Sequence, residues 1–378
     1  APNNDFVKEN FIKKEVYIPM RDGVKLFTSI YIPKDISKAK KYPFLMQRTC
    51  YSVAPYGENE YRSALGPNKY LMNEKYVFVY QDVRGRYMSE GTFTNMTPQV
   101  ERKTKKDVDE STDTYDTIEW LLKNINNNNG KVGQYGTSYP GFYTAAGILA
   151  DHPALVASSP QAPISDFWND DFLHNGKFML GYFRTFPVFG VQKTKAEKEG
   201  WYMDSFVKPT SEDGLKFYRE MGTLKDGYEK YYKDNFFMTE IMNHPNYDEY
   251  WQKRSLLPHL KNVNHAVMTV GGWFDAEDLA GPLNIYKTIE KTSPKAKNTI
   301  VMGPFSHGAW SRETGKHFHN EIYFGDSIAT YYQKNLETKF FHHYLKENSK
   351  TDAGLPEAMM YDTGSKEWKE FANYPPKN

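Results

Sequence analysis

The sequence predicts an α/β fold with a mostly parallel sheet flanked by helices. Residues 42–47 (YPFLMQ) and 76–80 (YVFVY) are short, continuous apolar runs, which are typical of strands buried on both faces. Segments with helical spacing alternate with these and later runs, as in successive strand–helix–strand units. Residues 168–258 interrupt this alternation, because they are rich in Lys, Glu, Tyr and Phe and lack β-branched runs. We interpret them as a mainly helical insertion.

The first half of the chain predicts a hairpin and then strands and helices in alternation. Residues 15–19 and 26–31 are β-rich and flank Arg21-Asp22-Gly23, which is a turn sequence. Residues 111–123 carry apolar side chains at helical spacing, and the Asn-rich run at 126–130 ends that helix. The next expected elements are a strand at 131–135, a helix at 139–149 and a strand at 155–157.

The alternation resumes after the insertion, so the segments on either side of it belong to one domain. The expected elements there are a strand at 265–270, a helix at about 282–290, a strand at 298–302 and a β-like stretch at 358–361. The expected division is an α/β domain at 1–167 and 259–348, a helical cap at 168–258 and a tail at 349–378.

Composition excludes several classes of protein. The 378 residues are enough for about two and a half domains. Lys and Arg together number 48 against 47 Asp and Glu, so no overall basic field attracts nucleic acid or an anionic membrane. Cys50 is the one cysteine, which excludes an intramolecular disulfide framework and a multi-thiolate metal site. No apolar run approaches the ~18 residues that span a bilayer.

The chain begins Ala1-Pro2-Asn3-Asn4, without an initiator Met. A signal peptide removed upstream would leave such a start. We therefore expect a periplasmic or secreted protein, with a cytoplasmic location still open.

Residues 131–141 (KVGQYGTSYPG) have the pattern of a nucleophile elbow, in which a serine lies on a tight turn between a strand and a helix. Ser138 is the candidate nucleophile. The usual pattern has glycine two residues after the serine, whereas Pro140 stands there and Gly141 follows. Proline is tolerated in a first helical turn, where its missing N–H would be unpaired. The alternative is an ordinary turn in which Ser138 caps the helix.

A serine nucleophile needs a histidine base, and the histidine needs a carboxylate that fixes its tautomer. Asp275 follows the expected strand at 265–270, and His307 follows the one at 298–302. The order Ser138, Asp275, His307 is that of the α/β-hydrolases. Each residue also lies just beyond the carboxyl end of an expected strand, where open α/β sheets carry their sites. The sequence therefore predicts a catalytic triad.

Acyl transfer also requires donors for the developing oxyanion. In this fold one donor is the backbone N–H of the residue after the nucleophile, here Tyr139. The second comes from the loop after an earlier strand, where residues 48–51 (RTCY) follow the run at 42–47. The phenol of Tyr51 is a candidate, and packing of its ring on that loop is the alternative.

Five segments together resemble the α-amino acid ester hydrolases, which belong with the cocaine esterase, glutaryl-cephalosporin acylase and X-Pro dipeptidyl-peptidase group. These segments are 48–51 (RTCY), 81–87 (QDVRGRY), 136–142 (GTSYPGF), 275–278 (DAED) and 303–307 (GPFSH). The match runs from the start of the chain to Pro376. The resemblance implies an α/β-hydrolase domain with a helical cap and a following jelly roll. It also implies the triad Ser138, Asp275 and His307, with Tyr51 and Tyr139 as the oxyanion hole.

In the amino-acid-specific members of this group, three carboxylates bind the α-ammonium of the substrate. By resemblance these are Asp171, Glu277 and Asp278 in this sequence. Carboxylates placed close together repel one another unless a cation lies among them, so the pattern fits a cationic substrate group. The alternative for Glu277-Asp278 is a salt-bridged or solvated loop.

We therefore expect a serine esterase that forms an acyl-enzyme on Ser138 from α-amino acid esters or β-lactam amides, and that can also run the reaction toward synthesis. Its partner is a small-molecule substrate, with no cofactor, metal, nucleic acid or membrane, and a homo-oligomer is possible in this group. Three alternatives remain: a glutaryl-cephalosporin acylase or general esterase, an X-Pro dipeptidyl peptidase, and a non-catalytic binding protein with this fold. The tail at 349–378 resembles the segment that leads into the jelly roll, which we expect to be absent or truncated.

Overall fold

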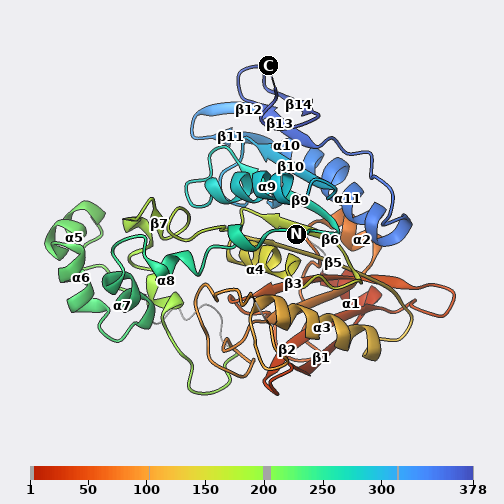
Figure 1. The fold of residues 1–378 in the computed structure, drawn as a ribbon, viewed down its shortest axis with the longest axis horizontal. Helices are drawn as coiled ribbons and strands as arrows, with labels where there is room; N and C mark the ends of the chain where they lie inside the picture. Colours follow the sequence, from red (N-terminus) through yellow and green to blue (C-terminus); the bar gives the residue numbers. More distant parts are fainter. Residues whose placement is uncertain (1–3, 102, 199–205, 313–314, 378) are drawn as a thin grey trace.

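The computed structural model describes residues 4–101, 103–198, 206–312 and 315–377, which form one large sheet with helices on both faces (Figure 1). In this part of the chain the sheet has ten strands, in the order β1-β2-β4-β3-β5-β6-β9-β10-β13-β14. Neighbours from β4 to β13 are parallel, and antiparallel pairs lie at both ends. The strands are β1 (Phe11–Pro19), β2 (Lys25–Pro33), β3 (Tyr42–Thr49), β4 (Val77–Asp82), β5 (Asn128–Thr137), β6 (Leu155–Gln161), β9 (Ala266–Gly272), β10 (Asn298–Gly303), β13 (Ala358–Asp362) and β14 (Glu367–Phe371).

The strands and helices expected in the first half and after the insertion are confirmed, with small differences at their ends. The helices outside the insertion are α1 (Asn4–Asn10), α2 (Lys69–Glu74), α3 (Glu110–Asn124), α4 (Tyr139–Ile148) and α9 (Ala280–Thr292). Residues 328–347 form a further helical segment, in which α10 (Ile328–Tyr331) and α11 (Thr338–His342) alternate with the π-helical turns η6 (Tyr332–Glu337) and η7 (His343–Glu347). No described helix is long and apolar enough to cross a bilayer.

Strand β4 shows why the apolar runs are continuous. Val77 and Val79 pack in one cluster with Ile118 of α3. Phe78, which lies between these valines, packs in another cluster with the helical segment 328–347. Because successive side chains of a strand point to opposite faces, both faces of β4 are covered.

Among the described residues of 168–258 the longer elements are helices, and a small hairpin lies there that the sequence pattern did not indicate. The elements of this insertion are β7 (Leu173–His174), β8 (Lys177–Phe178), η1 (Leu180–Tyr182), η2 (Phe186–Phe189), α5 (Gly214–Met221), α6 (Leu224–Tyr231), α7 (Phe236–Asn243) and α8 (Glu249–Gln252). Helices α5 to α8 gather on one side of the molecule (Figure 1). Phe172, Phe186 and Phe237 share one aromatic cluster with Phe142 of α4, which attaches the insertion to the α/β domain.

The structure differs from the expected tail at 349–378. The β-like stretch there is confirmed as β13, but it pairs in parallel with β10 and is part of the main sheet. β14 then adds an antiparallel edge strand. The sequence of β14, EWKEF, is rich in charge because an edge strand faces solvent, so its apolar pattern is weak.

The topology brings the candidate triad to one edge of the sheet. β5, β6, β9 and β10 are consecutive parallel neighbours, so their carboxyl ends lie at the same edge. Ser138 follows β5, Asp275 follows β9 and His307 follows β10. Open α/β sheets carry their functional sites at the carboxyl ends of the strands, so this edge holds the candidate site.

Candidate active site

Ser138 has the geometry of a nucleophile elbow. Its backbone has φ 68° and ψ −128°, a conformation that non-glycine residues rarely adopt. Its backbone N–H donates to the carbonyl of Gln161 on β6 at 2.9 Å. Although Ser138 occupies the N-cap position of α4, its side chain makes no capping hydrogen bond. The structure therefore does not support the alternative of a helix-capping serine, and strained turns of this kind are typical of functional sites.

Close backbone approaches explain the two glycines of the elbow. A Cβ on Gly136 would lie 2.3 Å from the carbonyl oxygen of Pro140. A Cβ on Gly141 would lie 2.4 Å from the carbonyl oxygen of Gln161, so this glycine lets α4 pack closely against β6. Gly141 thus performs the packing role although it stands one residue later than in the usual pattern.

We expect Gly141→Ala to destabilise the fold by about 1–3 kcal/mol, because the added methyl group meets backbone that has no room to move. Gly214→Ala is the matched control, since no atom lies within 4 Å of the added Cβ at the start of α5. Urea unfolding of both variants checks this. Equal stability of Gly141→Ala and wild type would contradict the close approach.

Asp275 and His307, the candidate acid and base, form a hydrogen-bonded pair. The Nδ1 of His307 lies 2.8 Å and 3.0 Å from the two carboxylate oxygens of Asp275. Burial alone would raise the pKa of Asp275, but the hydrogen bonds from His307 and from the backbone N–H groups of Glu277 and Asp278 lower it. Burial likewise opposes protonation of His307, and Asp275 outweighs this and raises the pKa of the imidazole. The pair therefore stabilises the imidazolium that forms when the base accepts a proton.

His307 and Ser138 lie in adjacent loops. The residue after His307 is Gly308, which packs beside Thr137. A Cβ on Gly308 would lie 3.6 Å from the methyl group of Thr137. The Nε2 of His307 lies 3.3 Å from a carboxylate oxygen of Glu277. Among the described residues, no hydrogen bond joins the Ser138 hydroxyl to His307. Such bonds are often long in unliganded hydrolases and shorten when substrate binds.

The two oxyanion-hole candidates lie side by side. The ring of Tyr51 contacts the ring of Tyr139 edge to face, with 6.3 Å between centroids. Tyr139 is the first residue of α4, where a backbone N–H has no partner inside the helix. Burial, together with the nearby charges of Asp171 and others, raises the pKa of Tyr51 well above its usual range, so its phenol stays a donor. The loop that carries Tyr51 is fixed by Asp82, which accepts a hydrogen bond from the Val53 N–H at 3.0 Å.

The three carboxylates that the resemblance pointed to come together beside His307. The backbone N–H of Asp171 donates to the carbonyl of Glu277 at 2.9 Å, which joins the insertion to the loop after β9. Asp278 lies 3.9 Å from the Nδ1 of His307. Asp278 is fully buried, and neither of its carboxylate oxygens has a hydrogen-bond partner among the described residues. Burial and the neighbouring acids raise the pKa of Asp278 well above its usual range and that of Asp171 to about 7. The group of Asp171, Glu277 and Asp278, hereafter the acidic cluster, is a largely buried set of carboxyl groups beside His307. Asp171 and Asp278 favour the protonated form unless a cation lies among them.

Two further residues belong to this region that sequence reasoning did not single out. Asp170 is buried and accepts a hydrogen bond from the Ala280 N–H at 3.0 Å, while its other oxygen has no partner among the described residues. Tyr182 lies close enough to Asp171 to lower the pKa of that carboxyl. The doublet Asp170-Asp171 was a visible signal, whereas the position of Tyr182 depends on how the insertion folds.

A divalent cation is a second chemical possibility for part of this region. Ligand atoms of Glu277, Asp278 and His307 lie within 4.8 Å of one another. A metal there would engage a ring nitrogen of His307, yet one nitrogen binds Asp275 and the other is needed as the base. An ammonium group leaves both nitrogens in those roles, so it fits the arrangement better.

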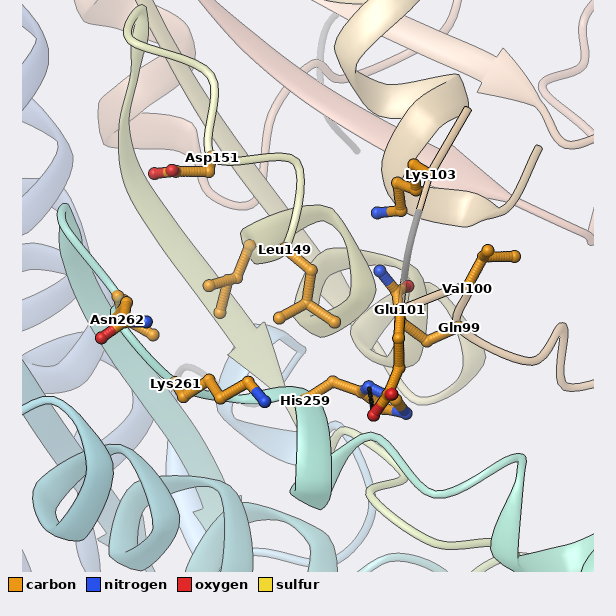
Figure 2. Close-up of a pocket in the computed structure, with 11 residues that line it drawn as sticks. Gln99, Val100, Glu101, Lys103, Leu149, Asp151, His259, Lys261 and Asn262 are labelled. Carbon is orange, nitrogen blue, oxygen red and sulfur yellow. Dashed lines mark ion pairs between the residues drawn. The ribbon is translucent and has the colours of Figure 1, made fainter. Parts of the chain in front are cut away.

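A separate pocket of about 470 Å³ lies at the other end of α4 (Figure 2). Ile148 and Leu149 line it, about 15 Å along the helix from Ser138 at a rise of ~1.5 Å per residue. The charged side chains that line it include both acidic and basic residues. A carboxylate oxygen of Glu101 lies 3.8 Å from the Nδ1 of His259. None of the predicted catalytic residues lines this pocket, so its size does not mark the active site.

Comparison with known proteins places these observations in a family. Residues 22–309 match the family described as X-Pro dipeptidyl-peptidase (S15 family). The cocaine esterase of Rhodococcus sp. (strain MB1 Bresler) is 23% identical over 96% of this chain and 60% of its own length. An aminopeptidase from the marine sediment archaeon Thaumarchaeota archaeon superposes with a TM-score of 0.85 at 31% identity, covering 100% of this chain and 61% of that one.

An α-amino acid ester hydrolase also superposes with a TM-score of 0.85, at 28% identity over 99% of this chain and 59% of that one. The expected α/β-hydrolase fold and the family resemblance are thereby confirmed. The chain spans about 60% of the length of the curated relatives that it matches.

Proposed function

This chain belongs to the X-Pro dipeptidyl-peptidase (S15) family, and on that basis we propose that it is a serine hydrolase for esters and amides of α-amino acids. The observation that supports this most is the acidic cluster beside the triad. Asp278 is buried with two oxygens that lack partners among the described residues, and such a charge is costly unless a cation or donor meets it. A substrate ammonium group supplies both the charge and the donors.

The reaction follows from the triad geometry. His307 takes the proton of the Ser138 hydroxyl as the oxygen attacks the acyl carbonyl, and Asp275 stabilises the resulting imidazolium. The Tyr139 N–H and the Tyr51 phenol donate to the oxyanion of the tetrahedral intermediate. The intermediate collapses, the leaving group takes the proton from His307, and the acyl group stays on Ser138. Water, or the amine of a β-lactam nucleus, then attacks the acyl-enzyme with His307 again as the base.

The acidic cluster determines which acyl group is accepted. An α-ammonium lies one bond from the carbon that carries the reacting carbonyl, so a group held at the cluster presents that carbonyl to Ser138. Two of the structurally similar proteins are named for substrates with a free α-amino group, an aminopeptidase and an α-amino acid ester hydrolase. A glutaryl group would bring a carboxylate toward Asp171, Glu277 and Asp278, which argues against the acylase alternative.

The test compares the methyl ester of phenylglycine with the methyl ester of phenylacetate, which differs only in lacking the amino group. We expect kcat/KM to be at least about 100-fold higher for the amino ester, as for other buried charged contacts. Equal kcat/KM values for the two esters would contradict a role of the acidic cluster in binding the substrate amine.

One alternative is favoured by a specific observation, since the matching family model is that of X-Pro dipeptidyl peptidases. These enzymes also need a free amine. In their substrates the amine belongs to the first residue and the cleaved bond follows the second. Alanyl-prolyl-nitroanilide therefore separates the two activities. We expect it to be cleaved far more slowly than phenylglycine methyl ester, and the reverse preference would favour the peptidase.

The preference for the amino ester should depend on pH. A pKa of about 7 at Asp171 means that this carboxyl gains a proton as the pH falls through 7, which weakens its attraction for ammonium. The ratio of kcat/KM between amino and deaminated ester is therefore expected to fall from pH 8 to pH 6. Because both esters need the same neutral His307, the titration of the base cancels in the ratio. The ratio should also fall above about pH 8, where the substrate amine loses its own proton.

Steady-state kinetics across this range check the prediction. A ratio that stays constant from pH 6 to pH 8 would contradict the titration of the acidic cluster.

A further inference from the structure

Gln161, the last residue of β6, contacts both catalytic loops. Its backbone carbonyl accepts the Ser138 N–H at 2.9 Å. Its side-chain oxygen accepts from the Thr137 hydroxyl at 3.2 Å and from the Trp310 indole N–H at 2.8 Å. Thr137 precedes the nucleophile, and Trp310 lies three residues after His307. One amide therefore ties the loop of the nucleophile to the loop of the base.

Glu337 fixes the orientation of that amide. This carboxylate is 1% exposed and accepts hydrogen bonds from Gln161 Nε2 and Asn68 Nδ2, both at 2.7 Å, and from the Tyr332 hydroxyl at 3.1 Å. Burial raises the pKa of Glu337, and the hydrogen bonds from Asn68, Gln161 and Tyr332 act in the opposite direction. Because all three neighbours donate to this carboxyl group, Gln161 turns its NH2 group toward Glu337. Its oxygen is then held toward Thr137 and Trp310.

The helical segment 328–347 contacts the loop of the base a second time. Gln333 Nε2 donates to the backbone carbonyl of Trp310 at 2.8 Å. Gln333 and Glu337 both lie in the π-helical turn η6. π-Helical turns are rare and often occur at functional sites, because the wider turn changes where side chains point.

We propose that Glu337 and Gln161 are positioning residues, which hold the elbow of Ser138 and the loop of His307 in register through one buried hydrogen-bond chain. The inference rests on the proposed serine-hydrolase function. A buried ionised carboxylate is an expensive way to stabilise a fold, since an apolar residue of similar volume often does so as well. Its link through Gln161 to both catalytic loops gives it a role in the spacing of the nucleophile and the base.

The first variant is Glu337→Gln, which keeps the volume of the side chain. It replaces one carboxylate oxygen, which accepts from Gln161 or from Asn68, by an NH2 group. Either Gln161 or Asn68 then faces another donor, so we expect the Gln161 amide to turn or shift. A displacement of about 1 Å at a catalytic group can cost on the order of 100-fold in rate. We expect kcat for phenylglycine methyl ester to fall at least tenfold while KM changes less than about threefold, because the acidic cluster is untouched.

A double variant separates positioning from simple loss of stability. In Glu337→Gln combined with Gln161→Glu, the carboxylate now at position 161 accepts from Trp310, from Thr137 and from the amide NH2 group now at position 337. The amide oxygen at position 337 accepts from Asn68. The Tyr332 hydroxyl, which donates to the Glu337 oxygen that faces Gln161, then accepts the second hydrogen of the new NH2 group. With that one reversal every member of the chain keeps a partner, and the net charge is unchanged. We expect this double variant to recover most of kcat. A folded double variant that stays as slow as Glu337→Gln would overturn the proposal.

Glu290→Gln is the matched control. This half-buried glutamate accepts a side-chain amide of Asn298 at 2.7 Å, as Glu337 does from Asn68, but it lies on α9 away from both catalytic loops. We expect it to leave kcat unchanged even where it lowers Tm. A kcat loss in Glu290→Gln equal to that in Glu337→Gln at equal Tm would also overturn the proposal.

Fluorophosphonate labelling distinguishes failure of this inference from failure of the proposed function. Labelling of wild type at Ser138 together with an unchanged labelling rate in Glu337→Gln would contradict the positioning role alone. Absence of labelling in wild type would contradict the serine-hydrolase function on which it rests.

Discussion

Ser138→Ala is expected to lower kcat for ester hydrolysis by about 10⁴- to 10⁶-fold, since removal of a triad nucleophile has effects of this order in serine hydrolases. The variant keeps the strained turn and the packing of α4, because alanine fits wherever serine does. It loses only the oxygen that becomes acylated. Steady-state kinetics with phenylglycine methyl ester measure the loss, and labelling by a fluorophosphonate should disappear with it.

Ser37→Ala serves as the control for removal of a hydroxyl. Ser37 lies in an exposed turn, where its oxygen accepts the Lys40 N–H at 3.1 Å. We expect its kinetics to match wild type. Activity of Ser138→Ala within tenfold of wild type would mean that another group carries the reaction.

Asp278→Asn is expected to act selectively on substrates that carry an amino group. Loss of one partner of a buried charge pair costs about 2–5 kcal/mol, so kcat/KM for phenylglycine methyl ester should fall on the order of 10²- to 10³-fold. The value for phenylacetate methyl ester should change less than about threefold, because that ester makes no contact with the acidic cluster. The ratio of the two values is the measurement.

Stability provides a second readout for Asp278→Asn. Burial raises the pKa of Asp278, and neither of its carboxylate oxygens has a hydrogen-bond partner among the described residues, so its ionised form adds nothing to the stability of the fold. We expect Tm of the variant to equal or exceed that of wild type. Asp109→Asn is the contrasting case at a buried aspartate, because the second carboxylate oxygen of Asp109 accepts the Val100 N–H at 3.0 Å and lies 3.4 Å from the Lys103 ammonium, so this variant should lose stability. A loss of activity on both esters together would contradict a specific role in ammonium binding.

The parallel sheet could be predicted because its strands are covered on both faces. The runs at 42–47 and 76–80 are apolar without alternation, and the structure places Val77 and Phe78 in different clusters on opposite faces. The shared position of the three triad candidates at one edge of the sheet could be predicted for a related reason. Strands end where apolar runs stop, and the carboxyl ends of parallel strands meet at one edge.

Other parts of the fold carry too weak a pattern. β14 combines charged and aromatic residues without regular alternation on an edge, so its pairing with β13 is set by the neighbouring strand and not by its own composition. The helical turns at 332–347 depart from the regular 3.6-residue repeat, which hides them from a search for that period.

The finer parts of the site depend on contacts between distant residues. Glu337 meets Gln161 across 176 positions of the chain, and no local pattern indicates that pair. Tyr182 lies near Asp171 because of the way the insertion folds, and no local pattern indicates that contact. Asp171, Glu277 and Asp278 could be named through resemblance to a family, whereas their burial and missing partners are visible only in three dimensions.

The central claim is that Ser138 is acylated by groups that carry an α-ammonium. The most direct measurement mixes phenylglycine methyl ester and phenylacetate methyl ester in equal amounts, stops turnover with acid and identifies the acyl group on each peptide by mass spectrometry. The account predicts a phenylglycyl group on the peptide that contains Ser138, in large excess over phenylacetyl. Equal amounts of the two acyl groups, or an acyl group on any other residue, would contradict it.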